Sequence, residues 1–243
     1  CSAKGADLSA CLGKEAAVLA AFALPQADHP HCVCGGDGDV NGHEHDTAVT
    51  WTTTDSLPDS AGNYYLTQSV SGNWTVPTGE VNLCLNGQTI SGSITVGSGA
   101  SLTLTDCSSD NSGKIQGGVT VNGGTLELYS GTITGGVEVG RHSKPATGSS
   151  FTMYGGTISG NTDTGGVFLV GTTNHIDPPS FTMHGGSISG NKTAGYGGGV
   201  YVQAGTTSFT MTGGTITGNS AGHDGGGVYV KNGSFTMTGG SIT

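Results

Sequence analysis

Most of this chain repeats a short unit, and the repeat constrains the fold more than any other feature. Each of the best-preserved copies opens with Phe-Thr-Met, followed one residue later by Gly-Gly and a Ser/Thr-Ile-Ser/Thr triplet. These copies begin at Phe151, Phe181, Phe209 and Phe235. After three of them, Gly-Asn, a glycine run and a Val-rich segment complete the unit. Because units of one design stack on their neighbours, we expect a solenoid.

A less regular form of the same unit extends toward the N-terminus, with leucine pairs in place of Phe and Met. The first strands of successive units start at Leu83, Leu102, Leu126, Phe151, Phe181, Phe209 and Phe235. Every unit holds three short segments, so the sequence predicts an all-β, right-handed parallel β-helix with about seven coils. A β-propeller is excluded, because its blades of roughly 40 residues are longer than these units.

Alternation along each strand predicts which side chains face the interior. In the first strand the outer pair points inward and the middle residue outward, while Ile and the Val pair fill the second and third strands. The corners carry Gly and Asn, which adopt positive φ at little cost. We expect Asn161, Asn191 and Asn219 to stack there as a ladder of side-chain amides.

Composition agrees with a repeat protein and divides the chain into two parts. Glycine accounts for 47 of 243 residues and charged residues for only 10%. Residues 62–243 are expected to form the β-helix, apparently truncated at its C-terminus, with an incomplete first coil at residues 62–82. Residues 1–61 are expected to form an irregular or helical cap, with a helix from Leu8 to Leu24, because an open solenoid end needs a cover.

Net charge argues against two classes of partner. The formal charge is −10, and no basic face is available for nucleic acid. Attachment to an anionic membrane is disfavoured for the same reason. The longest apolar run, residues 16–24, is too short to cross a bilayer. We therefore expect no nucleic-acid binding and no membrane insertion.

A histidine- and cysteine-rich segment near the N-terminus is a candidate metal site. Thiolate and imidazole are the preferred ligands of Zn²⁺, and a structural site takes four of them. The sequence offers two close pairs as ligands, Cys32 with Cys34 and His43 with His45. The alternative is a pair of disulfides with surface histidines, since six cysteines allow fifteen connectivities. An overlapping calcium-loop pattern that starts at Asp37 lacks its final carboxylate, because Ala48 stands there.

The outward positions of the coils suggest binding rather than catalysis. Phe168, Tyr201 and Tyr229 occupy the same strand position in consecutive coils and are predicted to form an outward aromatic column for a glycan or protein partner. Glu127 and Glu138 belong to one coil but to different faces, so no carboxylate pair is expected for acid–base work. We expect no enzymatic activity and no cofactor apart from the N-terminal metal.

The phrases ITGNSAGHDGGGVYV and ISGNKTAGYGGGVYV resemble repeats of adhesin-like bacterial surface proteins, similar to polymorphic outer membrane protein repeats. LCLNGQTI and LTLTDC resemble coils of large β-helix proteins secreted by Gram-positive bacteria. The resemblance implies an extracellular location on a bacterial cell surface and a role as a binding face or stalk for a glycan or a cell-surface protein. The alternatives are a fragment of a polysaccharide-active enzyme and a self-assembling fibre protein, with possible end-to-end self-association.

Overall fold

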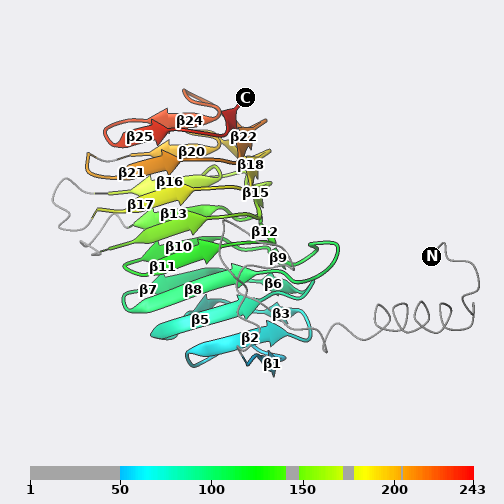
Figure 1. The fold of residues 1–243 in the computed structure, drawn as a ribbon. Coiled ribbons are helices and arrows are strands. Elements are labelled where there is room, and N and C mark those ends of the chain that lie inside the picture. Colours follow the sequence, from blue (N-terminus) through cyan, green and yellow to red (C-terminus); the bar gives the residue numbers. More distant parts are fainter. Residues whose placement is uncertain (1–49, 141–147, 172–177, 204) are drawn as a thin grey trace, which may run out of the picture. The chain divides into compact units, whose positions relative to one another are not determined.

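A computed structural model describes residues 50–140, 148–171, 178–203 and 205–243 of the chain (Figure 1). Every regular element in these residues is a β-strand. Strands pair in parallel with their counterparts in the coils before and after, which produces three long sheets. The predicted all-β parallel β-helix is therefore confirmed.

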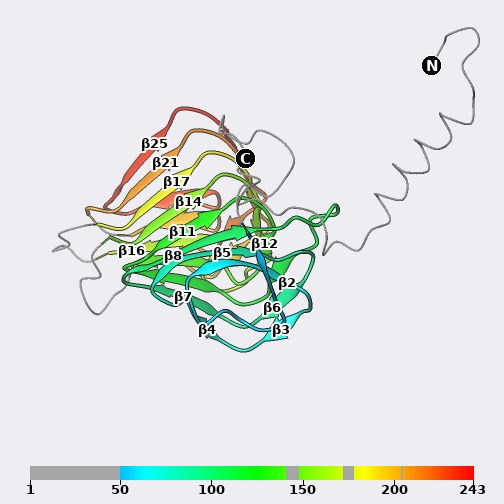
Figure 2. The same cartoon turned by 60° about the horizontal axis from the view of Figure 1, so that its bottom comes forward.

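Each sheet collects one strand from every coil, and successive coils can be followed from β2 to β25 in Figure 2. Sheet A comprises β1 (Thr52–Thr54), β2 (Gly62–Leu66), β5 (Gly79–Cys84), β8 (Ala100–Thr105), β11 (Thr125–Leu128), β14 (Ser150–Met153), β17 (Ser180–Met183), β21 (Ser208–Met211) and β25 (Ser234–Met237). Sheet B comprises β3 (Val70–Ser71), β6 (Thr89–Ser91), β9 (Lys114–Ile115), β12 (Thr132–Ile133), β15 (Thr157–Ser159), β18 (Ser187–Ser189), β22 (Thr215–Thr217) and β26 (Ser241–Ile242).

Sheet C comprises β4 (Trp74–Thr75), β7 (Ile94–Gly97), β10 (Val119–Asn122), β13 (Val137–Gly140), β16 (Val167–Val170), β20 (Val200–Val202) and β24 (Val228–Val230). These seven strands mark seven complete coils within the described residues. A short pair, β19 (Lys192–Thr193) with β23 (Ser220–Ala221), adds a fourth ladder in the longer loops that follow the Asn corners.

The interior is filled as the alternation predicts. Phe151, Phe181, Phe209 and Phe235 pair residue on residue along sheet A. Their rings stack with centroid distances of 4.7, 4.7 and 4.8 Å. The first three rings are fully buried, whereas Phe235 is partly exposed. Stacked apolar side chains of this kind form one continuous core instead of a central globular one.

The Asn corners form the expected ladder. The backbone N–H of Asn161 donates to Asn191 Oδ1 at 3.2 Å, and that of Asn191 donates to Asn219 Oδ1 at 2.9 Å. The glycine before each asparagine has positive φ, as at Gly190 (φ 63) and Gly218 (φ 61), which other residues rarely adopt. The side-chain amides of Asn191 and Asn219 therefore satisfy backbone groups of the preceding coil.

The first coil differs from the expectation. Residues 62–82 were expected to form an incomplete coil, but β2, β3 and β4 supply all three strands. The missed strand, Val70–Ser71, is only two residues long and has one apolar side chain, too little to show a period. Strand pairing begins still earlier, at β1, which lies ahead of the expected boundary at residue 61 and pairs with β2. The expected helix from Leu8 to Leu24 lies outside the described residues.

One loop is tied covalently to the solenoid. Cys84, at the end of β5, forms a disulfide with Cys107, and the two Cα atoms are 6.4 Å apart. The neighbouring Asp106 carboxylate is buried and accepts hydrogen bonds from Gly87 N at 2.8 Å and Gly113 N at 2.6 Å. The bond from Gly113 closes the loop from Asp106 to Gly113, while the bond from Gly87 and the disulfide hold the start of the loop against the preceding coil.

Candidate functional site

The predicted aromatic column lies on sheet C. Phe168 of β16, Tyr201 of β20 and Tyr229 of β24 pair in register, and all three side chains are partly buried. The strand neighbours of Phe168 and Tyr201 are buried, whereas Val230 beside Tyr229 is exposed. Ring centroids of Phe168 and Tyr201 are 5.0 Å apart with planes 13° from parallel. Tyr201 and Tyr229 are 5.4 Å apart but tilted by 53°. The column thus departs from a regular stack at its third ring.

Two residues outside the strands enlarge this column. Tyr196 stacks on Tyr229 at 4.7 Å and contacts Tyr201 at 6.1 Å, and His223 stacks on Tyr196 at 5.0 Å. Tyr196 is 37% exposed, whereas Phe168, Tyr201 and Tyr229 are partly buried. We call Phe168, Tyr196, Tyr201, His223 and Tyr229 the aromatic cluster.

The sequence carried a signal for both added residues. Tyr196 follows Ala194-Gly195, and His223 follows Ala221-Gly222, at the same place in successive units. The backbone N–H of His223 donates to Gly195 O at 2.9 Å, so these loops also stack coil on coil. Reading only the strands for outward positions misses such loop residues.

The stacking determines which parts of the rings a ligand can reach. Phe168 and Tyr201 stack face to face, so these two faces are closed to a ligand, whereas Tyr196, which stacks on both Tyr229 and His223, is 37% exposed. Burial, together with the neighbouring phenols of Tyr229 and Tyr196, raises the pKa of Tyr201. Its hydroxyl is therefore neutral at physiological pH and can both donate and accept hydrogen bonds.

A second aromatic stack follows the strands of sheet A. Tyr129, Tyr154 and His184 each come directly after a strand, with centroid distances of 4.5 and 5.1 Å. His184 Nδ1 and Thr212 Oγ1 are hydrogen-bonded at 2.8 Å, so Thr212 continues the column. The Tyr129 hydroxyl donates a hydrogen bond to Glu127 Oε2 at 3.4 Å. This stack was not among the sequence predictions.

The two carboxylates considered for catalysis are on different sheets. Glu127 lies in β11 of sheet A, and Glu138 lies in β13 of sheet C, as expected. The solenoid interior between these sheets is occupied by buried apolar side chains such as Leu126 and Val137. The two carboxylates therefore lie on different sheets of the solenoid, with its apolar interior between the sheets.

The predicted metal ligands Cys32, Cys34, His43 and His45 lie outside the described residues. Within the described ranges, no group of three or more His, Cys, Asp or Glu side chains is placed to hold a metal ion. The part of the chain that the structure describes also contains no helix long and apolar enough to cross a membrane.

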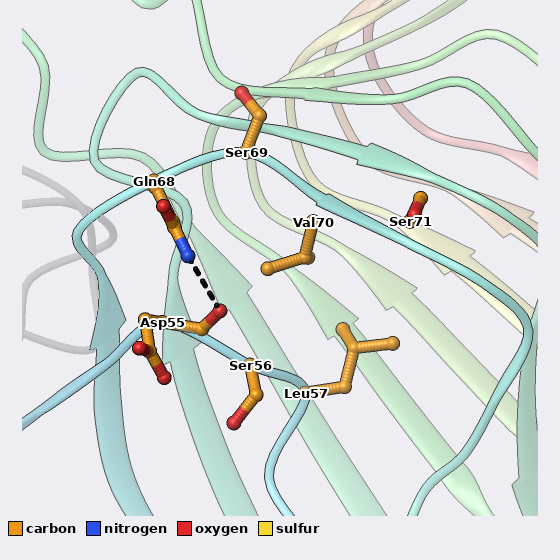
Figure 3. A pocket seen from close by; sticks show the side chains of 7 residues that line it. All are labelled: Asp55, Ser56, Leu57, Gln68, Ser69, Val70 and Ser71. Atoms are coloured by element: carbon orange, nitrogen blue, oxygen red, sulfur yellow. Dashed lines mark hydrogen bonds between the residues drawn. The ribbon is translucent and has the colours of Figure 1, made fainter.

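A hollow of about 440 Å³ opens near β1 and β3 (Figure 3). Leu57 and Val70 form its apolar side and pack against the core, while Gln68 Nε2 donates to Asp55 O at 3.2 Å across it. Pro58, which follows Leu57, accepts at its backbone O a 2.8 Å hydrogen bond from the indole N–H of the buried Trp74. This segment therefore covers the core at the first coil.

The fold and these side chains define a parallel β-helix whose outward aromatic residues gather on sheet C and at the corner after sheet A. Comparison with protein-family models, curated proteins and solved structures finds no match to the chain.

Proposed function

We propose that the chain is a non-enzymatic, extracellular β-helix module of a bacterial cell surface whose aromatic cluster contacts a glycan or a cell-surface protein. The observation that carries the proposal is the convergence of five rings from three coils at one place on sheet C. Aromatic side chains bring large contact areas with few rotatable bonds, which suits an interface anchor.

The chemistry around the rings supports a mixed apolar and hydrogen-bonding contact. Tyrosine hydroxyls and the exposed imidazole of His223 are combined with ring edges, so the aromatic cluster can hydrogen-bond while it buries apolar area. Both glycans and polar protein surfaces present this combination. The Cys84–Cys107 disulfide supports an extracellular location, because such bonds persist in oxidising compartments.

The test measures binding and assembly with matched variants. Wild type and the triple variant Phe168→Ala, Tyr201→Ala, Tyr229→Ala are compared on a glycan array and by light scattering, and Tyr196→Ala provides a milder change outside the strands. His184→Ala, which alters the far end of the other aromatic stack, is the control. We expect array signals to fall in the triple and Tyr196 variants and to persist in the control.

Three outcomes decide the proposal. Loss of self-association without loss of glycan signals would identify the aromatic cluster as a contact between copies of the chain. Retention of every wild-type glycan signal by the triple variant, with unchanged circular dichroism, would mean that the aromatic cluster is ordinary surface. Polysaccharide turnover that disappears on mutation of Glu127 or Glu138 would contradict the non-enzymatic assignment.

A further inference from the structure

A second hollow lies at the corner between sheets A and B. Its volume is about 360 Å³, and its lining includes Asn111, Tyr129, Gly131, Thr132, Gly156 and Thr157. Tyr129 ends the sheet A side, Thr132 and Thr157 start strands β12 and β15, and Asn111 comes from the loop that Cys107 ties down. Among the described residues that line this hollow, none carries a formal charge.

The rim of the hollow is held in place before any ligand arrives. Asn111 has a positive φ of 50°, and its N–H donates to Ser108 O at 3.1 Å. Ser108 Oγ in turn donates to the buried Asp106 carboxylate at 2.8 Å. With the disulfide at Cys107, these contacts fix the loop, so little conformational entropy is lost when Asn111 contacts a ligand.

Two glycines form the tight corner beside the hollow. Gly131 (φ 87) and Gly156 (φ 74) both have left-handed backbone, which disfavours any side chain. A Cβ on Gly156 would approach Gly131 O to 2.9 Å. These two positions therefore require glycine because of the tight corner, and the polar groups around the hollow come from the neighbouring side chains.

The side chains around this space have a common chemistry. One amide, two threonine hydroxyls and a phenol can each donate and accept hydrogen bonds, and the Tyr129 ring adds an apolar edge. Glu127, 3.4 Å from the Tyr129 hydroxyl, makes the neighbourhood unfavourable for an anion. Small-molecule sites have volumes of about 300–1,000 Å³. The volume of this hollow is near the lower end of that range, so it suits a small ligand.

We propose that this hollow binds one sugar ring of a neutral glycan. The amide of Asn111 and the hydroxyls of Thr132 and Thr157 hydrogen-bond the ring hydroxyls, and Tyr129 contacts the apolar C–H groups. The hollow belongs to sheets A and B, whereas the aromatic cluster lies on sheet C, so either can bind without the other.

The test uses the full chain and small soluble probes. Saturation-transfer NMR is recorded with the methyl glycosides of glucose, galactose, mannose and N-acetylglucosamine, and with glucuronate as the charged comparison. We expect transfer to at least one neutral glycoside and none to glucuronate. Affinities for the responding glycoside are then measured by titration.

Paired variants locate the binding. Asn111→Gly keeps the positive φ, and Thr132→Val keeps the side-chain shape, so together they remove polar groups at little risk to folding. We expect the double variant to bind about tenfold more weakly, as the loss of two net hydrogen bonds implies. Thr215→Val changes the same strand position three coils away and should bind like wild type.

Three results would overturn the proposal. One is no transfer to any neutral glycoside, and another is equal weakening by Thr215→Val. The third is loss of binding in Tyr196→Ala alone, which would assign the sugar to the aromatic cluster and so support the proposed function while removing this site.

Discussion

Asn191 Nδ2 lies between two coils and donates to Asn219 Oδ1 at 3.0 Å and to Ile158 O at 2.9 Å. The same Oδ1 also accepts the backbone N–H of Asn191 at 2.9 Å. With 1% of its surface exposed, Asn191 is a buried polar residue whose hydrogen-bonding groups are matched by the coils on either side. The ladder therefore links three coils through side chains as well as through strands.

Asn191→Ala is expected to destabilise the solenoid. The change leaves Ile158 O and the Asn161 N–H without their side-chain partner in a buried place, which costs about 1–3 kcal/mol per unsatisfied group. Chemical denaturation followed by circular dichroism gives the midpoint shift. Ser189→Ala, an outward change on β18 nearby, is the control, and equal midpoints for the two variants would contradict a structural role for the ladder.

The position of a phenylalanine along its stack should determine its contribution to stability. Phe181→Ala removes a buried ring that contacts rings on both sides, so we expect a loss of about 3–5 kcal/mol. Phe235→Ala removes a partly exposed ring with a stacked neighbour in Phe209, and roughly half that loss is expected. Denaturation midpoints of the two variants test this order. A larger effect at Phe235 would show that the core is not continuous.

Reduction of the Cys84–Cys107 disulfide should lower stability without unfolding the chain at room temperature. The bond closes a sequence separation of 23 residues, for which chain entropy predicts about 3 kcal/mol. Denaturation with and without a thiol reductant measures the difference. In the variant Cys84→Ala, Cys107→Ala, the reductant should no longer lower the denaturation midpoint through this bond. Non-reducing peptide mapping of wild type should recover the two cysteines as a linked pair. Recovery of either cysteine with another partner would contradict the pairing.

Stability should fall at high pH because of Tyr129. Burial, followed by the charge of Glu127 and the phenol of Tyr154, raises its pKa above the ordinary value. Below about pH 10 the phenol is protonated in both the folded and the unfolded state, so Tyr129 contributes fully to the free energy of unfolding. As the pH rises further, the phenol of the unfolded state ionises first, and this contribution is lost. Denaturation midpoints at pH 8 and pH 11 should differ less in Tyr129→Phe than in wild type. An unchanged difference would exclude Tyr129 as the source.

The strands could be predicted from the sequence because the alternation of apolar residues and the repetition of the unit indicate the same segments. Phe151 and Phe181 stand at equal positions in nearly identical phrases, so their register follows once coils stack. The short strand at Val70 offers no such pattern and was missed. The disulfide could not be chosen among fifteen connectivities, because Cys84 and Cys107 are brought together by the stacking of coils.

Only some residues of the candidate sites could be predicted from the sequence, for a related reason. Phe168 and Tyr201 lie within strands, where alternation predicts outward side chains. Tyr129 stands one residue beyond its strand, yet its N–H still donates to Leu104 O at 3.0 Å, so the ladder continues into the corner. Tyr196 sits in a loop, where no period predicts direction. Corners and loops therefore have to be compared between copies in the same way as strands.

The residue-on-residue register also bears on how such a chain can change length in evolution. Excision of residues 181–208 would join Ser180 to Phe209 and place Phe209 between Phe151 and Phe235, an environment equivalent to that of Phe181 between two phenylalanines. Recombination between copies can thus add or remove whole coils while the junction remains native-like. A deletion that cuts into a strand would instead break its residue-on-residue pairing with both neighbours, so we expect changes of length to be whole coils or to fall in the loops.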